Sequence, residues 1–285
     1  SLRKAPSAAK PRLPGFVQGP CGARDAHGPD CAPCEQRQHH QIIPLSALRT
    51  EFEQKKQSAA GKQGYHEICD IRRRIALTNP LLNFEDIVFV EHDPVHNPYL
   101  HMTRQYYGFH HAGQNVGGLY LLKGAFGPNP QKIDVLAAAG NPLSGGVYLS
   151  PELSYDGQTI YFAWCAGTGG GDEYAEDNCF HIYKVNVDGS GFQRLTSGPE
   201  NDFDPCPLPS GRIAFISTRR SKNEFRMNLR CGAMVEDAYT LHSMKPGGSD
   251  IITLSFHETH EWHPSVDNNG MLVYTRWDYV DRASN

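Results

Sequence analysis

The sequence predicts a mainly β fold of repeated four-stranded units, preceded by an extended arm and one or two helices. Three observations lead to this prediction. Residues 180–220 and 239–278 align with each other without a gap until their ends. Both stretches alternate short strand patterns with glycine-containing turns such as NVDGSG and PSGR, which join antiparallel strands. The first forty residues have no hydrophobic periodicity and are rich in proline, glycine and alanine.

Two segments precede the repeats. Residues 1–40 are expected to form an extended arm, because nothing in their composition favours a helix or a strand. Residues 41–78 carry two runs of apolar side chains at helical spacing. These are Leu45, Leu48 and Phe52 in the first run, and Ile68, Ile71 and Ile75 in the second. The sequence SAAGKQG between them favours a break, so we expect two helices.

Residues 79–285 are expected to form β-propeller blades, because they contain two copies of a repeat that are offset by 59 residues. Phe180 aligns with Tyr239, and Asp204 aligns with His263. A third, partial copy at 150–164 matches the strand-turn-strand half of this unit. Repeats of this length with two hairpins each are typical of β-propeller blades. A β-sandwich is the alternative architecture.

The predicted β-propeller of four-stranded blades is incomplete in this chain. A closed ring needs about 4–8 blades. Residues 84–149 supply one blade, two more follow, and the last copy, truncated at the C-terminus, stops after one hairpin. An unclosed ring leaves sheet edges that need a cover. We expect the remaining domains of a longer chain to supply it, with other subunits as the alternative partners.

Charge and composition exclude some functions. Lys and Arg total 27 against 31 Asp and Glu, so the chain lacks the basic character that nucleic-acid binding requires. No apolar run approaches the ~18 residues of a membrane span. The N-terminus has neither an initiator Met nor the apolar core of a signal peptide, as expected after processing or at a domain boundary. Eight cysteines are compatible with disulfides, which favours a periplasmic or extracytoplasmic location.

Polar residues flank a proline in the innermost strand of each copy, in the sequences SPE, DPC and HPS. Because side chains alternate along a strand, the first and third residues of each triplet share a face. If that face lines the channel, six residues form a polar ring: Ser150, Glu152, Asp204, Cys206, His263 and Ser265. A thiolate beside a carboxylate and an imidazole suits Zn or Cu. The alternative is that Cys206 is an ordinary buried thiol.

The segment HETHEWHP, which begins at His257, concentrates three histidines before the last proline. We expect it to join an outer strand to the next innermost strand at one mouth of the channel, with His257 and His260 in a loop. A metal site there would use His257, His260, His263 and Cys206. A polar channel mouth that binds no metal is the alternative reading.

Another candidate metal site lies in the N-terminal arm. A tetrahedral zinc site needs four nitrogen or sulfur ligands, and this arm offers four such residues at irregular spacing. They are Cys21, His27, Cys31 and Cys34. A disulfide or an unstructured arm is the competing interpretation.

Several strings of the β region resemble one known family. They include LSPELSYDGQTIYFAW, DFDPCPLPSGR and HPSVDNNGMLVYTRWDYVDR, and the resemblance runs from about Leu77 to Arg282. The family is the β-propeller region of hydrazine synthase alpha subunits, a branch of the TolB-like propellers. The resemblance implies a propeller that acts as scaffold and docking surface in a multi-domain extracytoplasmic protein. It also implies an oxidoreductase complex, with c-type haem on the parent protein or its partner chains.

No cofactor is evident in this chain itself. Covalent c-type haem needs Cys-x-x-Cys-His, and the sequence CAPCEQ has Glu35 in place of the histidine. Whether the chain is enzymatic therefore stays open. The alternative function is a non-catalytic TolB-like propeller that binds a protein, peptide or glycan at its channel mouth. A weaker third hypothesis is a metal-dependent hydrolase or lyase built on the polar ring.

Overall fold

The computed structural model of the chain describes most of the predicted helical and β segments. The described residues are 44–79, 82, 84–91, 117–127, 129–143, 145–166, 178–219, 229–231, 234–236, 239–257 and 260–277. The N-terminal candidate site of Cys21, His27, Cys31 and Cys34 lies outside them. The described strands belong to one compact unit and the two helices to another. None of the described helices has the length and apolar character needed to cross a membrane.

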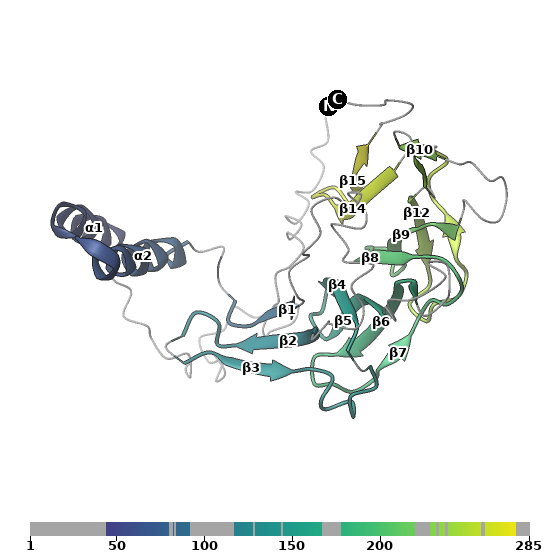
Figure 1. Cartoon of the computed structure of the whole chain (residues 1–285), viewed down its shortest axis with the longest axis horizontal. Coiled ribbons are helices and arrows are strands. Elements are labelled where there is room, and N and C mark those ends of the chain that lie inside the picture. Colours follow the sequence, from purple (N-terminus) through teal and green to yellow (C-terminus); the bar gives the residue numbers. More distant parts are fainter. Residues whose placement is uncertain are drawn as a thin grey trace, which may run out of the picture. The chain divides into compact units, whose positions relative to one another are not determined.

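The two predicted helices are confirmed (Figure 1). Helix α1 spans Leu45–Ser58 and helix α2 spans Gly61–Leu77. The chain between them is extended at Ala59 and Ala60, and Gly61 has a φ of 66°, a value that glycine adopts without steric cost. Leu48 and Ile71, both predicted for the apolar faces, are buried.

The β unit begins with a three-stranded antiparallel sheet and continues with two four-stranded sheets (Figure 1). The first sheet consists of β1 (Ile87–Glu91), β2 (Gly118–Lys123) and β3 (Gln131–Asp134). The second consists of β4 (Val147–Leu153), β5 (Thr159–Cys165), β6 (His181–Asn186) and β7 (Gln193–Arg194). The third consists of β8 (Asp202–Pro207), β9 (Ile213–Ser217), β12 (Thr240–Met244) and β13 (Ile252–Thr253).

Two smaller pairs complete the described β structure. Strands β10 (Leu229–Cys231) and β11 (Met234–Glu236) form a hairpin in the connection between β9 and β12. Strands β14 (His260–Val266) and β15 (Leu272–Trp277) form the last sheet. The four-stranded antiparallel sheets follow one another in chain order, as the sequence repeat predicts. Described strands do not close into a ring.

The repeat is visible in individual hydrogen bonds. The Asp202 N–H donates to Phe180 O at 2.8 Å, and 59 residues later the Glu261 N–H donates to Tyr239 O at 2.9 Å. Both outer turns also match, because Gly189 N–H bonds Asn186 O and Gly248 N–H bonds Lys245 O. The internal repeat of the sequence is therefore a repeat of backbone geometry.

Neighbouring sheets share their cores. Phe215 of β9 packs in one buried cluster with Tyr161 and Ile182 of the preceding sheet. On the opposite face of β9, Ile216 packs in another cluster together with Tyr274 of β15. Each central sheet thus buries one face against the sheet before it and the other against the sheet after it, which is the packing of propeller blades.

Candidate functional site at the innermost strands

The strands β4, β8 and β14 share an irregularity that alternation alone does not predict. The pairing register shifts between Leu149 and Glu152 in β4, and at the corresponding positions of β8 and β14. At each shift the residue before proline has a left-handed backbone, with φ of 47° at Ser150, 50° at Asp204 and 49° at His263. Such a conformation costs a residue other than glycine roughly 1–3 kcal/mol. Its recurrence makes it a built feature of the innermost strands.

Proline accounts for part of this geometry. Pro151, Pro205 and Pro264 have no backbone N–H, so none of them can donate a hydrogen bond to the neighbouring strand. A bulge at this point removes the need for that bond. It also turns the preceding side chain away from the ordinary alternation. The sequence predicts that the first and third residues of each triplet lie on one face of a regular strand. In the structure a bulge lies between them, so the strand is not regular at this point.

The three left-handed residues meet at the carboxylate of Asp204. The Ser150 hydroxyl donates to Asp204 Oδ1, and the His263 N–H donates to Oδ2 at 3.1 Å. The His263 ring also lies at this carboxylate, with Nδ1 3.3 Å from Oδ2. Asp204 is buried, whereas the His263 side chain is 62% exposed. One carboxylate therefore joins three consecutive sheets.

The contact between His263 and Asp204 changes the pKa of the histidine. The hydrogen bond to Asp204 raises the pKa of His263, and partial burial opposes that rise only in part. The protonated ring is stabilised by the negative carboxylate. The contact with Asp204 therefore favours the protonated form of the His263 ring.

Glu152 and Cys206 form the second part of the predicted ring, together with Tyr155. Burial raises the pKa of Glu152 to about 7. Burial also raises the pKa of Cys206 to about 12, and the charge of Glu152 adds to the effect. The pKa of Tyr155 is raised by burial first and then by Cys206 and Glu152. Cys206 is therefore a neutral thiol at physiological pH and a poor nucleophile.

The structure does not bring the predicted metal ligands together. His260 is the first residue of β14 and is buried, so its expected place in a loop is wrong. The Tyr239 N–H lies 3.4 Å from its Nδ1. The His257 ring instead lies beside Arg276, at 3.4 Å, and His263 contacts Asp204. Over the described part of the chain, no three His, Cys, Asp or Glu side chains gather into a group that would hold a metal ion.

Ser265 is the most weakly connected member of the predicted ring. Its side chain lies at the exposed end of β14, and its hydroxyl is 3.5 Å from Val273 O within the same hairpin. Ser150, Asp204 and His263 thus make contacts between sheets, Glu152 acts on Cys206 electrostatically, and Ser265 bonds within its own sheet.

Sequence reasoning missed a second set of side chains that link the sheets. Glu261 accepts hydrogen bonds from the Leu241 N–H at 2.9 Å and from the Ser255 hydroxyl. At the equivalent position one sheet earlier, the buried carboxylate of Asp202 instead pairs within its own sheet, with Arg219 at 2.6 Å. The sequence does contain a signal for this set, because acidic residues 59 positions apart, Asp202 and Glu261, occupy equivalent places in the two copies.

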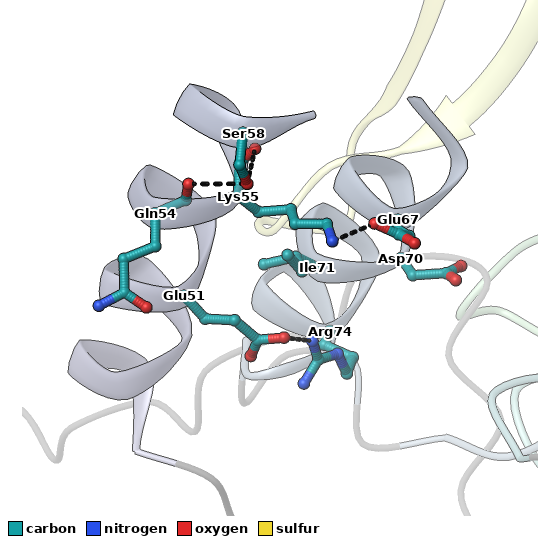
Figure 2. A pocket seen from close by; sticks show the side chains of 8 residues that line it. All are labelled: Glu51, Gln54, Lys55, Ser58, Glu67, Asp70, Ile71 and Arg74. Carbon is teal, nitrogen blue, oxygen red and sulfur yellow. Dashed lines mark hydrogen bonds and ion pairs between the residues drawn. The ribbon is translucent and has the colours of Figure 1, made fainter. Parts of the chain in front are cut away.

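The helical unit has a cavity of its own (Figure 2). It measures about 360 Å³ and lies between α1 and α2. Ion pairs of Lys55 with Glu67 and of Arg74 with Glu51 cross it. These two ion pairs neutralise four of the charged side chains that line the cavity, and Asp70 is a further acidic lining residue.

Comparison with known proteins gives similarity at the level of the fold. No protein-family model matches the chain, and no curated protein matches it. Among solved structures, a putative TolB from Agrobacterium tumefaciens is 17% identical, with a TM-score of 0.42, over 67% of this chain and 51% of that chain. The hydrazine synthase of Kuenenia stuttgartiensis is 12% identical, with a TM-score of 0.45, over 67% of this chain and 27% of that chain.

A third similar structure is described as a propeller. The β-propeller domain of the Trilobed protease from Pyrococcus furiosus is 11% identical, with a TM-score of 0.32, over 68% of this chain and 47% of that chain. The described strands have a β-propeller fold. The chain spans 51% or less of the length of each of these three structures.

Proposed function

We propose that this chain is the propeller portion of a multi-domain protein similar to the hydrazine synthase alpha subunit. In this proposal the propeller is an extracytoplasmic scaffold and docking surface, and c-type haem on the parent protein or its partners carries the redox chemistry. One observation carries the docking role. The last described blade exposes a face that the preceding blade buries.

The two blades differ at equivalent positions of β9 and β15. Ala214 and Ile216 face the following sheet and are fully buried, with exposed fractions of 0%. Their equivalents 59 residues later are Val273, which is 49% exposed, and Thr275, which is also exposed. Burying an apolar side chain stabilises a protein by about 25 cal/mol per Å². A further β-sheet packed on this face would recover that stabilisation.

The polar ring supports a scaffold rather than a reaction centre. Asp204 is engaged by Ser150 and by His263, and Cys206 is a neutral thiol. A catalytic nucleophile needs a lowered pKa or an adjacent base in a position to activate it. The ring side chains instead hold three blades in a fixed relation.

Recognition at the channel mouth is the second candidate function. The observation in its favour is that the His263 side chain is 62% exposed although its ring contacts a buried carboxylate. Such an exposed imidazole, whose protonated form Asp204 favours, is suited to an acidic group of a peptide, protein or glycan. The two functions differ in whether the channel mouth or the open blade binds the partner.

The test is purification of the protein from its native source, followed by intact mass, visible absorption and metal analysis. The scaffold proposal expects a parent protein or complex larger than 31.7 kDa that shows the Soret band of c-type haem. A haem-free species of 31.7 kDa would overturn it. Zinc or copper without haem would redirect attention to His263 and its neighbours.

A further inference from the structure

Among the described strands, the outer edge of β15 has no partner, whereas the outer edge of its counterpart β9 is paired. In the third sheet, β9 pairs with β8 on one side and with β12 on the other, and Met244 of β12 lies opposite Ile213. Strand β15 is the equivalent of β9, and among the described residues it pairs only with β14. Backbone N–H and C=O groups along such an edge are a template for another strand.

The side chain of Leu254 lacks its cover for the same reason. Its counterpart Leu195 is 7% exposed and packs in one cluster with Ile213, Phe215 and Met244 of the next sheet. Leu254 itself is 40% exposed. The equivalents of Ile213 and Phe215, which are Leu272 and Tyr274, are present in β15. Within the described part of the chain, no side chain takes the place opposite Leu272 that Met244 takes opposite Ile213.

The outer turns of the two preceding blades indicate that a hairpin docked beside β15 would need a glycine in its turn. Gly248 has a φ of 86°, and a Cβ at this position would collide with the carbonyl of Leu195. Gly189, one repeat earlier, has a φ of 84°, and a Cβ there would lie 2.8 Å from Val135 O. Both outer turns therefore press a glycine against the backbone of the preceding blade. An equivalent turn would place its glycine against Leu254.

The residue that contacts the outer hairpin differs between the two blades, and this difference indicates which turn charge the docking hairpin should have. Arg212 donates to Ser243 and to Asp250 of its own outer hairpin, at 3.0 and 2.8 Å. Met271 occupies the equivalent position in the last blade and is 61% exposed. A hairpin that docks there has no guanidinium to pair with an acidic turn residue, so an apolar or neutral turn fits better.

We propose that the edge of β15, together with Leu254 and Met271, is the docking surface for a β-hairpin supplied by the remainder of the multi-domain protein. This inference rests on the proposed function. The hairpin carries an alternating pattern, an apolar side chain opposite Leu272, and a turn glycine that packs against Leu254. It completes the last blade as β12 and β13 complete the one before it.

The experiment uses a synthetic peptide of residues 239–256, the outer hairpin of the preceding blade, with Asp250→Asn to make its turn neutral, as the probe. The labelled peptide is titrated into the 285-residue chain, with fluorescence anisotropy and hydrogen exchange as readouts. We expect saturable binding, with a Kd on the order of micromolar, and slower amide exchange across Leu272–Arg276. A control peptide carries Met244→Asp and Gly248→Val, and we expect it to bind at least tenfold more weakly.

Matched variants of the chain locate the contact. Leu254→Asp is expected to weaken peptide binding tenfold or more, whereas Ile133→Asp, an exposed apolar position on β3, is expected to leave it unchanged. Absence of peptide binding to a chain with native circular dichroism would overturn the inference. Self-association through β15, which the peptide fails to displace, would assign the surface to a second copy and also overturn it. Neither result depends on haem, so failure here is distinct from failure of the native purification.

Discussion

Replacing Asp204 by asparagine tests whether one carboxylate holds three blades together. Asparagine has nearly the same volume and tolerates the left-handed backbone of this position, where φ is 50°. The substitution therefore removes the negative charge with little change in shape. The Ser150 hydroxyl, the His263 N–H and the His263 ring lose a charged acceptor together.

The expected loss of stability comes from the difference between charged and neutral hydrogen bonds. A hydrogen bond to a charged group contributes about 1.5–3 kcal/mol and a neutral one about 0.5–1.5 kcal/mol. Asparagine retains one oxygen for the His263 N–H, while its NH₂ group faces the Ser150 hydroxyl, which can rotate to accept. With about 1 kcal/mol lost at each of two or three contacts, Asp204→Asn should lower the free energy of unfolding by about 2–3 kcal/mol.

Urea unfolding followed by circular dichroism measures this difference. Asp250→Asn is the matched control, because Asp250 also has a left-handed backbone, with φ of 56°, but is exposed and pairs with Arg212 at the surface. Its effect should be much smaller. If both variants unfold at the same urea concentration, the carboxylate of Asp204 does not link the blades as inferred.

Three further predictions concern titratable groups. Because its folded pKa is raised, His263 contributes stability that is complete below its ordinary value of 6.5 and is lost as pH rises through the folded pKa. His263→Asn should therefore lower the urea midpoint, relative to the parent chain, by more at pH 6 than at pH 9. An equal decrease at both pH values would contradict the ion pair. Glu152, whose pKa burial raises to about 7, destabilises the fold once it ionises. Thermal unfolding should thus show Glu152→Gln more stable than the parent at pH 8, by up to about 3 kcal/mol, and equal to it at pH 4. Native Cys206, with a pKa of about 12, should react with iodoacetamide at pH 8 at least tenfold more slowly than Cys69, by peptide mass spectrometry, and at the same rate in urea.

The blades could be predicted because their signals are local and repeated. Each hairpin carries its own glycine turn and alternating strands, and two copies at a constant offset reinforce each other. The helices α1 and α2 could be predicted for the same reason, since Leu48 and Ile71 lie at helical spacing and are buried.

The site could be predicted only in part, because its geometry arises between blades. The sequence places Ser150, Asp204 and His263 at equivalent positions, but strand alternation contains no information on the left-handed bulge that directs them to one carboxylate. The assignment of His260 to a loop failed because β14 begins earlier than its proline suggests. The contact of His260 with the Tyr239 backbone depends on the preceding blade, which local sequence does not describe.

The contacts that recur every 59 residues have a consequence for how the β unit comes apart. The last two junctions between described sheets are made by equivalent bonds, from the Asp202 N–H to Phe180 O and from the Glu261 N–H to Tyr239 O. In a linear array of this kind, stability is the sum of unit and nearest-neighbour terms, and disorder enters from the ends. Among the described sheets, the terminal ones are β1–β3 and β14–β15, and each has a neighbouring sheet on one side only. Loss of order is therefore expected to begin in a terminal sheet and to proceed sheet by sheet toward the centre.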